Sequence, residues 1–191
     1  VPALLLSVFA QFKVKSSCNK YSKGVSRKNI TGSQAAAYLL KVNGITDVKI
    51  QRVSGNLTDH YSPTEKILRL SDSVYDKTSI AAVGVAAHET GHAIQHATKY
   101  GPLGLRSTLV PVANIGSMIV NLGLLLFAAS VLFYLVTLPV EFNASNRALK
   151  ILKSSNSLDE EELKGVKKVL SAAALTYVAS ALTAVGNFLR I

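Results

Sequence analysis

The sequence predicts a mostly helical α+β membrane protein that combines transmembrane helices with a small antiparallel sheet. Residues 109–138 contain no charged side chain, and this run is longer than the roughly 20 residues that cross a bilayer. A second uncharged run, at residues 169–189, is also long enough, and its alanine, serine and threonine residues suit close helix packing. Between residues 47 and 70, imperfect alternation of apolar and polar residues around a Pro-containing turn favours short strands.

The beginning of the sequence is apolar as well, but residues 1–12 are too few to span a bilayer. We expect them to be the tail of an N-terminal transmembrane anchor whose beginning lies outside this sequence. The net charge of +10 reflects basic residues beside the apolar runs, as the positive-inside rule predicts for cytoplasmic loops. These residues are Lys13, Lys15, Lys20, Lys23, Arg27 and Lys28, and then Arg147, Lys150, Lys153, Lys164, Lys167 and Lys168. Because no aromatic-interleaved platform or known DNA-reading motif accompanies them, we expect no nucleic-acid partner.

Residues 16–100 form the predicted soluble portion. Residues 31–42 are expected to form a helix that is capped by Thr31 or Ser33. Short strands are predicted in three places, at residues 47–53, 57–61 and 66–70. The last two form a hairpin, so a small sheet precedes the next helix in the chain.

His88, Glu89 and His92 form an HExxH motif inside a stretch that predicts a helix, with Thr78 or Ser79 available as its N-cap. Histidines four residues apart lie one turn apart on the same helix face, so both imidazoles can reach one Zn²⁺ at ~2.0–2.1 Å. The stretch is apolar on all sides around this turn, and such a helix is buried. A buried His-Glu-His turn needs a partner such as a metal ion to offset desolvation. The alternative is a helix with two ordinary histidines.

The third ligand must come from outside the motif. His96 lies eight residues after the first motif histidine, about 12 Å along a helix axis, which is too far for one tetrahedral ion. Gln95 and Thr98 occupy the positions where a metzincin has Gly and His, so that class is excluded. The best candidate is Glu141, because Pro139 can open a helix and place Glu141 in its first turn. A glutamate there can also act simply as a partner of the helix dipole.

These segments resemble the YugP-type membrane-bound neutral zinc metallopeptidases, which are distantly akin to membrane-embedded gluzincins such as HtpX and the CAAX prenyl proteases. The resemblance runs from about residue 11 to the C-terminus and rests on residues 57–61, 88–96, 106–107 and 138–149. It implies that Glu141 is a metal ligand. In the wider gluzincin pattern, an Asp four residues after this glutamate orients a ligand histidine. Ser145 replaces that Asp here, so Ser145 or Asn146 is expected to take its role.

The resemblance also implies an edge strand beside the active-site helix. Leu57, Thr58 and Asp59 would belong to it and bind extended substrate by strand addition, in which backbone hydrogen bonds supply affinity. His60 would follow them, either as a residue of the active site or as an ordinary polar strand residue.

The expected mechanism is that of a zinc hydrolase. One Zn²⁺ per chain would lower the pKa of a bound water and polarise the scissile carbonyl. Glu89 would be the catalytic base that passes the water's proton to the leaving amine. A donor for the tetrahedral oxyanion is also required, and His60, Tyr61 and Arg147 are candidates.

We therefore expect a membrane-embedded zinc metalloendopeptidase whose partners are the lipid bilayer and membrane-proximal protein or peptide substrates. The lone Cys18 excludes an intramolecular disulfide framework and fits a reducing compartment. Together with the basic loops, it favours a bacterial plasma membrane protein with its active site on the cytoplasmic side. One alternative is a non-catalytic membrane scaffold, which the intact Glu89 argues against. A structural-zinc domain is disfavoured because no cysteine cluster is present.

The predicted site constrains the membrane topology. The motif histidines and Glu141 must meet at one ion, so an even number of crossings must separate them. We expect residues 109–138 to form a helical hairpin that is broken near Gly116 to Gly123. Because two full spans need more than ~40 residues, some connecting residues are expected to be missing. The predicted regions are the anchor tail (1–12), the catalytic region (13–108), the hairpin (109–138), the third-ligand helix and linker (139–168) and a C-terminal transmembrane helix (169–191).

Overall fold

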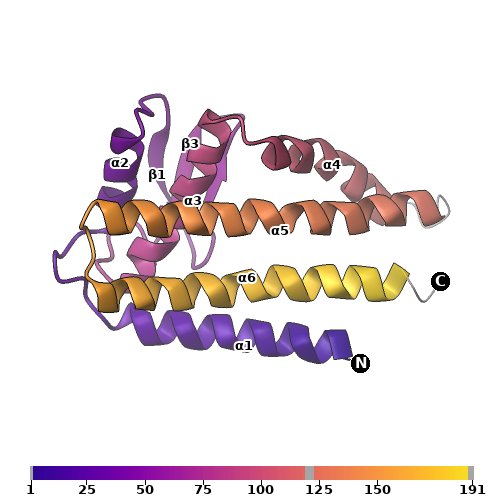
Figure 1. Ribbon diagram of the computed structural model, residues 1–191, viewed down its shortest axis with the longest axis horizontal. Coiled ribbons are helices and arrows are strands. Elements are labelled where there is room, and N and C mark those ends of the chain that lie inside the picture. Colours follow the sequence, from indigo (N-terminus) through magenta and orange to yellow (C-terminus); the bar gives the residue numbers. More distant parts are fainter. Residues whose placement is uncertain (1, 119–122, 189–191) are drawn as a thin grey trace.

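The computed structural model describes residues 2–118 and 123–188, and it confirms the predicted fold class of a mostly helical α+β protein. Its elements follow one another along the chain in the order shown in Figure 1. They are α1 (Pro2–Ser22), α2 (Gly32–Val42), β1 (Lys49–Val53), β2 (His60–Ser62), β3 (Ile67–Ser71), α3 (Ile80–Ala97), α4 (Gly101–Met118), α5 (Gly123–Ser154) and α6 (Glu160–Phe188).

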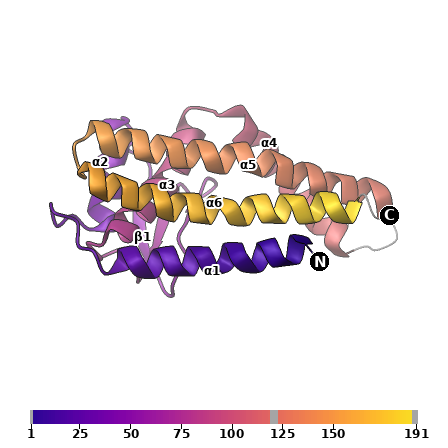
Figure 2. The same ribbon diagram turned by 60° about the horizontal axis from the view of Figure 1, so that its bottom comes forward.

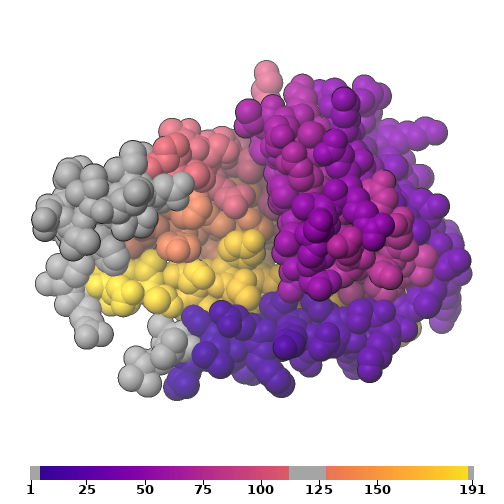
Figure 3. Space-filling view, turned by 180° about the vertical axis from the view of Figure 1, so that it is seen from behind, coloured from indigo at the N-terminus to yellow at the C-terminus, as the bar shows by residue number. Residues whose placement is uncertain are grey.

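Three long helices lie side by side, with α6 between α1 and α5 (Figures 1 and 2). The sheet, α2 and α3 are gathered at one end of this layer, and α4 leads away from them along α5. Seen from behind, α1 runs along the lower edge of the molecule beneath the sheet region (Figure 3). Close packing joins the helices, since a Cβ on Gly165 of α6 would lie 2.9 Å from ring atoms of Tyr21 on α1.

The sheet is mixed, with strand order β1-β3-β2, whereas the sequence predicted an antiparallel sheet. The predicted hairpin is present and antiparallel, with His60 opposite Arg69, but β1 pairs with β3 in parallel. The reason is that β3 is the most apolar strand and lies in the middle. There Leu68 and Leu70 are fully buried in a cluster with small residues of α2 and α3. This arrangement leaves β2 at an edge of the sheet, beside α3.

The predicted helix starts are confirmed by their caps. Thr31 caps α2, because its hydroxyl accepts a hydrogen bond from the Gln34 N–H while the Gln34 side chain accepts one from the Thr31 N–H. Ser79 caps α3 by accepting from the N–H of Ala82. Because these caps fix where each helix begins, they also fix which face α3 turns to its neighbours.

Helix α3 is the centre of the fold. It packs against α2, the sheet, α5 and α6, and most of its residues are buried. Small side chains allow the close contacts, since a Cβ on Gly84 would lie 2.9 Å from the Val166 side chain of α6. A helix surrounded in this way can bury its polar turn only where that turn finds partners.

The predicted hairpin corresponds to α4 and α5, which pack against each other. Within the range where the break was predicted, Gly116 to Gly123, α4 extends to Met118 and α5 begins at Gly123, and residues 119–122 lie outside the described part of the chain. Pro139 does not open a helix, which corrects the prediction, because α5 runs through it from Gly123 to Ser154. Proline removes one helical hydrogen bond to the carbonyl four residues earlier, but packing against α4 and α6 keeps α5 continuous. The predicted region borders at 138/139 and 168/169 therefore both fall inside helices.

Among the described residues, two helical stretches are long and apolar enough to cross a membrane, by length and composition alone. They are Ala128–Ser154 and Glu160–Phe188. Helix α1 adds an apolar stripe at helical spacing, in which Leu5, Val8, Phe9 and Phe12 are each more than half exposed. An exposed stripe of this kind is typical of a surface that contacts apolar surroundings.

Candidate metal centre

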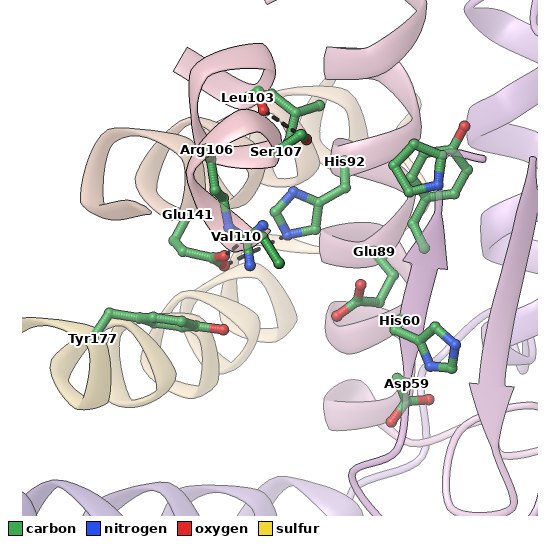
Figure 4. Close-up of a pocket in the computed structure, with 12 residues that line it drawn as sticks. Asp59, His60, Glu89, His92, Leu103, Arg106, Ser107, Val110, Glu141 and Tyr177 are labelled. Carbon is green, nitrogen blue, oxygen red and sulfur yellow. Dashed lines mark hydrogen bonds and ion pairs between the residues drawn. The ribbon is translucent and has the colours of Figure 1, made fainter. Parts of the chain in front are cut away.

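Helices α3 and α5 bring together the two motif histidines and the predicted third ligand. The Nε2 atoms of His88 and His92 lie 3.3 and 3.5 Å from Oε2 of Glu141, and the possible ligand atoms of the three residues all lie within 4.8 Å of one another. Figure 4 shows Glu141 and His92 facing each other from different helices. Glu141 lies in the middle of α5, so it is not a partner of that helix's N-terminal dipole.

The Glu141 carboxylate is suited to hold a cation. Its side chain is 3% exposed, and Oε2 is a buried atom without a hydrogen-bond partner. A buried charge of this kind is normally paired or bound to a metal. Two imidazole nitrogens and one carboxylate oxygen form a donor set typical of zinc in hydrolases, where a fourth position stays open. The residues present therefore fit the zinc ion that the HExxH motif implies.

A chain of hydrogen bonds fixes the tautomer of His92. Arg147 can only donate, and its Nε donates to Oδ1 of Asn143 at 2.7 Å, so this atom is an acceptor. Nε2 of Gln95 therefore donates to Asn143 Oδ1 and to the carbonyl oxygen of Val140, at 3.0 and 2.7 Å. Oε1 of Gln95 must then face His92, whose Nδ1 donates to it at 3.0 Å. The lone pair of His92 lies on Nε2, the atom that faces Glu141.

His88 has a simpler partner. Its Nδ1 lies 3.0 Å from the hydroxyl of Ser145, which can accept a hydrogen bond and leave Nε2 free as a ligand atom. Ser145 is buried and is one helical turn after Glu141, the position at which the gluzincin pattern has Asp. Asn146, the other candidate for this role, is exposed and lines a separate hollow with Phe142 and Lys167.

Glu89 lines a cavity of about 260 Å³ beside the metal group, and its carboxylate points into that cavity (Figure 4). Burial raises the pKa of Glu89 above its ordinary value, and the neighbouring histidines partly oppose this effect. The cavity thus brings the candidate base and the candidate ligand set to one partly buried space, in which electrostatic interactions are stronger than in bulk water.

The structure places some of the other predicted site residues in the cavity and others outside it. His60 and Tyr61 line the cavity, but each already has a partner: His60 Nδ1 lies 2.8 Å from the carbonyl oxygen of Thr58, and Tyr61 Oη lies 2.8 Å from His96 Nδ1. Arg147 is not among the residues that line the cavity in the described chain. Its guanidinium lies 5.9 Å from the centre of the Tyr100 ring.

The predicted substrate strand begins later than expected. Leu57 has a φ of 58° and is 64% exposed, and a left-handed residue cannot continue a strand. Thr58 and Asp59 also precede β2, which starts at His60. Asp59 instead accepts hydrogen bonds from the Ser71 backbone N–H and hydroxyl, at 2.7 and 2.9 Å, and so holds the start of β2 against β3.

Arg106 and Tyr177 also line the cavity, although the sequence analysis assigned them no role. Nη1 of Arg106 lies 3.5 Å from Oε1 of Glu141, and Figure 4 shows the Tyr177 hydroxyl directed into the same space. A signal for Arg106 was available, since it is the sole charged residue in 100–140. Tyr177 is the sole tyrosine in the uncharged run 169–189, which is a weaker signal because aromatic residues are common in apolar helices.

A histidine pair on one helix, completed by a glutamate from a second helix, is the ligand set of the gluzincin class of zinc hydrolases, as in thermolysin. All 191 residues of the chain match the model of one family, described as "putative neutral zinc metallopeptidase". The chain belongs to this family, as the sequence analysis predicted.

The chain is also similar to a bacterial protein. The chain is 48% identical to the Bacillus subtilis (strain 168) protein called "Putative membrane protease YugP", over all of this chain and 92% of the relative. The alignment spans 206 positions, more than the 191 residues of this chain, so the relative contains residues without a counterpart here. No solved structure matches the chain.

Proposed function

We propose that this protein is a membrane-embedded zinc metalloendopeptidase that hydrolyses peptide bonds in membrane-proximal proteins or peptides. One observation carries the proposal: the partnerless oxygen of buried Glu141 faces the Nε2 atoms of His88 and His92, beside a cavity that also contains Glu89. Zinc, a base and a partly buried space are the parts that metal-assisted hydrolysis needs. The family and the name of the bacterial relative support the same reaction class.

The residues have separate roles in the proposed reaction. His88, His92 and Glu141 would hold the zinc ion, which would supply Lewis acidity for the scissile carbonyl and for a water molecule. Glu89 takes the proton from the attacking water and delivers it to the leaving amine. Gln95 and Ser145 hold the two imidazoles with their Nε2 atoms towards the metal position.

The edge strand supports a peptide as the substrate. Strand β2 pairs with β3 along one side, and its other side is not paired in the described chain. Because His60 and Tyr61 of this strand line the cavity, a peptide that pairs with β2 passes the metal position in an extended conformation. Backbone hydrogen bonds between the peptide and β2 provide binding affinity and do not require a particular peptide sequence.

The arrangement of apolar helix halves supports insertion into a bilayer. The N-terminal end of α1, the C-terminal end of α6 and the ends of α4 and α5 at Met118 and Gly123 lie at the end of the molecule away from the sheet (Figure 1). The basic residues between 13 and 28 and between 147 and 168 lie at the sheet end. By the positive-inside rule, we assign the sheet and the metal centre to the cytoplasmic side of a bacterial plasma membrane.

The test uses the full chain purified in detergent micelles. We expect about one zinc per chain by elemental analysis, and hydrolysis of casein that Glu89→Gln abolishes while zinc remains bound. Glu160→Gln, at the exposed start of α6, is the matched control and keeps full activity. Full activity of Glu89→Gln would exclude the proposed mechanism. Zinc binding without hydrolysis by the wild-type protein, on casein and on extracted membrane proteins, would identify a non-catalytic scaffold instead.

A further inference from the structure

A second hollow lies along the start of α4, beside the catalytic cavity. It has a volume of about 800 Å³ and lies between the turn that joins β2 to β3, the end of α3 and the first turns of α4. Pro63, Leu103, Ser107 and Val110 line both this hollow and the catalytic cavity. The two hollows therefore adjoin each other, and we call the larger one the α4 groove.

Two glycines leave the α4 groove open. Gly101 and Gly104 both line it, and a Cβ at either position would meet no atom within 4 Å. Neither glycine has a positive φ that would require it, and Gly104 lies inside α4, where glycine is unfavourable by roughly 1 kcal/mol relative to alanine. Their absence of side chains is therefore not explained by local backbone geometry or by packing. It is explained if another molecule lies over them.

The α4 groove carries one positively charged side chain, Lys99. Lys99 and His96 line it, and its lining in the described chain contains no acidic residue. The nearby carboxylates are already paired, since Glu65 binds Arg69 with two hydrogen bonds of 2.7 and 2.8 Å and Asp47 binds Lys66. The N-terminal end of α4 also begins at the groove, and its dipole favours negative charge.

We propose that the α4 groove binds the substrate segment that flanks the scissile bond, and that Lys99 makes the enzyme prefer peptides with acidic residues in that segment. This proposal rests on the proposed function. Because the groove adjoins the catalytic cavity, a chain that reacts in the cavity and extends beyond it, as a peptide does, can occupy both. Lys99, Thr64 and Tyr100 place polar groups in a lining that is otherwise mostly apolar, which suits an extended peptide in which apolar and charged side chains alternate.

The first experiment measures binding separately from hydrolysis. Zinc-loaded Glu89→Gln protein is titrated with fluorescein-labelled decapeptides in which leucine alternates with glutamate, serine or lysine, and Kd is read from fluorescence anisotropy. We expect the glutamate peptide to bind about threefold more tightly than the serine peptide, as for one partly exposed charge pair, and this difference to shrink in high salt. Adding Lys99→Glu should reverse the order of the glutamate and lysine peptides. Lys41→Glu, which makes the same charge change at an exposed position of α2, should leave the order of the peptide affinities unchanged.

The second experiment closes the groove. A Cβ at Gly104 enters open space, and the rest of the leucine side chain in Gly104→Leu extends over the groove, so we expect normal zinc content and thermal stability but at least tenfold weaker binding of all three decapeptides. Gly186→Leu is the matched control, because a Cβ at Gly186 also enters open space, near the C-terminal end of α6. This variant should bind all three decapeptides as the parent protein does. Normal decapeptide binding by Gly104→Leu overturns the proposal. So does a Lys99→Glu variant in which the order of the peptide affinities is the same as without this change.

Three further outcomes separate this proposal from the proposed function and from binding of a lipid. Casein hydrolysis by the zinc-loaded wild-type protein without any preference for acidic flanks counts against the α4 groove alone. Phosphatidylglycerol can also be added to the micelles. If it abolishes the binding of all three peptides to the same extent, the groove binds a lipid and the proposal is overturned. Absence of casein hydrolysis, with charge-selective peptide binding intact, counts against the catalytic function instead.

Discussion

Gly91 of α3 lies directly against the backbone of Ala144 on α5. A Cβ at position 91 would come within 2.6 Å of the Ala144 carbonyl oxygen and 3.1 Å of its Cα. These two residues lie one position before His92 and three positions after Glu141. The contact therefore sets the distance between α3 and α5 beside the candidate metal centre. Only glycine at position 91 permits so close an approach.

Gly91→Ala should therefore damage the metal centre. A backbone carbonyl cannot move aside as a side chain can, so α3 and α5 must separate, and overpacking of this kind costs typically about 1–3 kcal/mol. We expect a lower unfolding temperature and weaker zinc binding, measured by calorimetry and by competition with a chromophoric chelator. Gly104→Ala, which enters open space on α4, is the control and should retain both properties. Wild-type zinc affinity in Gly91→Ala would show that the helix separation does not control the site.

Gln95 should act on zinc through His92. Gln95→Leu keeps a similar volume but removes the acceptor that holds His92 Nδ1–H, and loss of such an outer partner typically costs about 10–100-fold in metal affinity. Thr90 offers a comparison on the same helix, because it is also buried but its hydroxyl donates to the Ala86 carbonyl oxygen. Thr90→Val should leave zinc affinity near the wild-type value. Equal zinc affinities for Gln95→Leu and the wild-type protein would contradict the role inferred for the hydrogen-bond chain.

Glu141→Ala should weaken zinc binding by more than the roughly 10–100-fold expected for an outer partner, because it removes a ligand. The control is Glu162→Gln, which changes a buried glutamate that accepts hydrogen bonds from the backbone N–H groups of Arg27 and Asp159. That change should lower stability and leave zinc affinity intact. Retention of zinc by Glu141→Ala under mild chelation would remove Glu141 from the ligand set.

The topology prediction can be tested with single cysteines. In a Cys18→Ser background, Lys99→Cys and Lys153→Cys place thiols before α4 and near the end of α5. Because α4 and α5 pack together as a hairpin, both thiols should react with a membrane-impermeant maleimide from the same side of sealed vesicles. Labelling from opposite sides would refute the hairpin and, with it, the meeting of Glu141 with the motif histidines.

Much of the local structure follows from short-range patterns. The Thr31 and Ser79 caps, the hairpin around residues 62–66 and the HExxH helix each depend on a few neighbouring residues whose chemistry is legible in sequence. The two motif histidines share a face for the same reason, since four residues make about one helical turn. The ligand role of Glu141 came from family resemblance, and the argument that used Pro139 as a helix start was wrong.

The sequence by itself determined which side chains can hold a metal, which stretches are long and apolar, and where α2 and α3 begin, because these properties depend on residue type and on spacing along the chain. Only the tertiary structure decided that β1 runs parallel to β3, that Ser145 rather than Asn146 contacts His88, and that Gln95, Arg106 and Tyr177 lie around the site. These residues come from helices far apart in sequence. Their meeting depends on close helix contacts such as that of Gly91 with Ala144, and such contacts leave no periodic trace in the sequence.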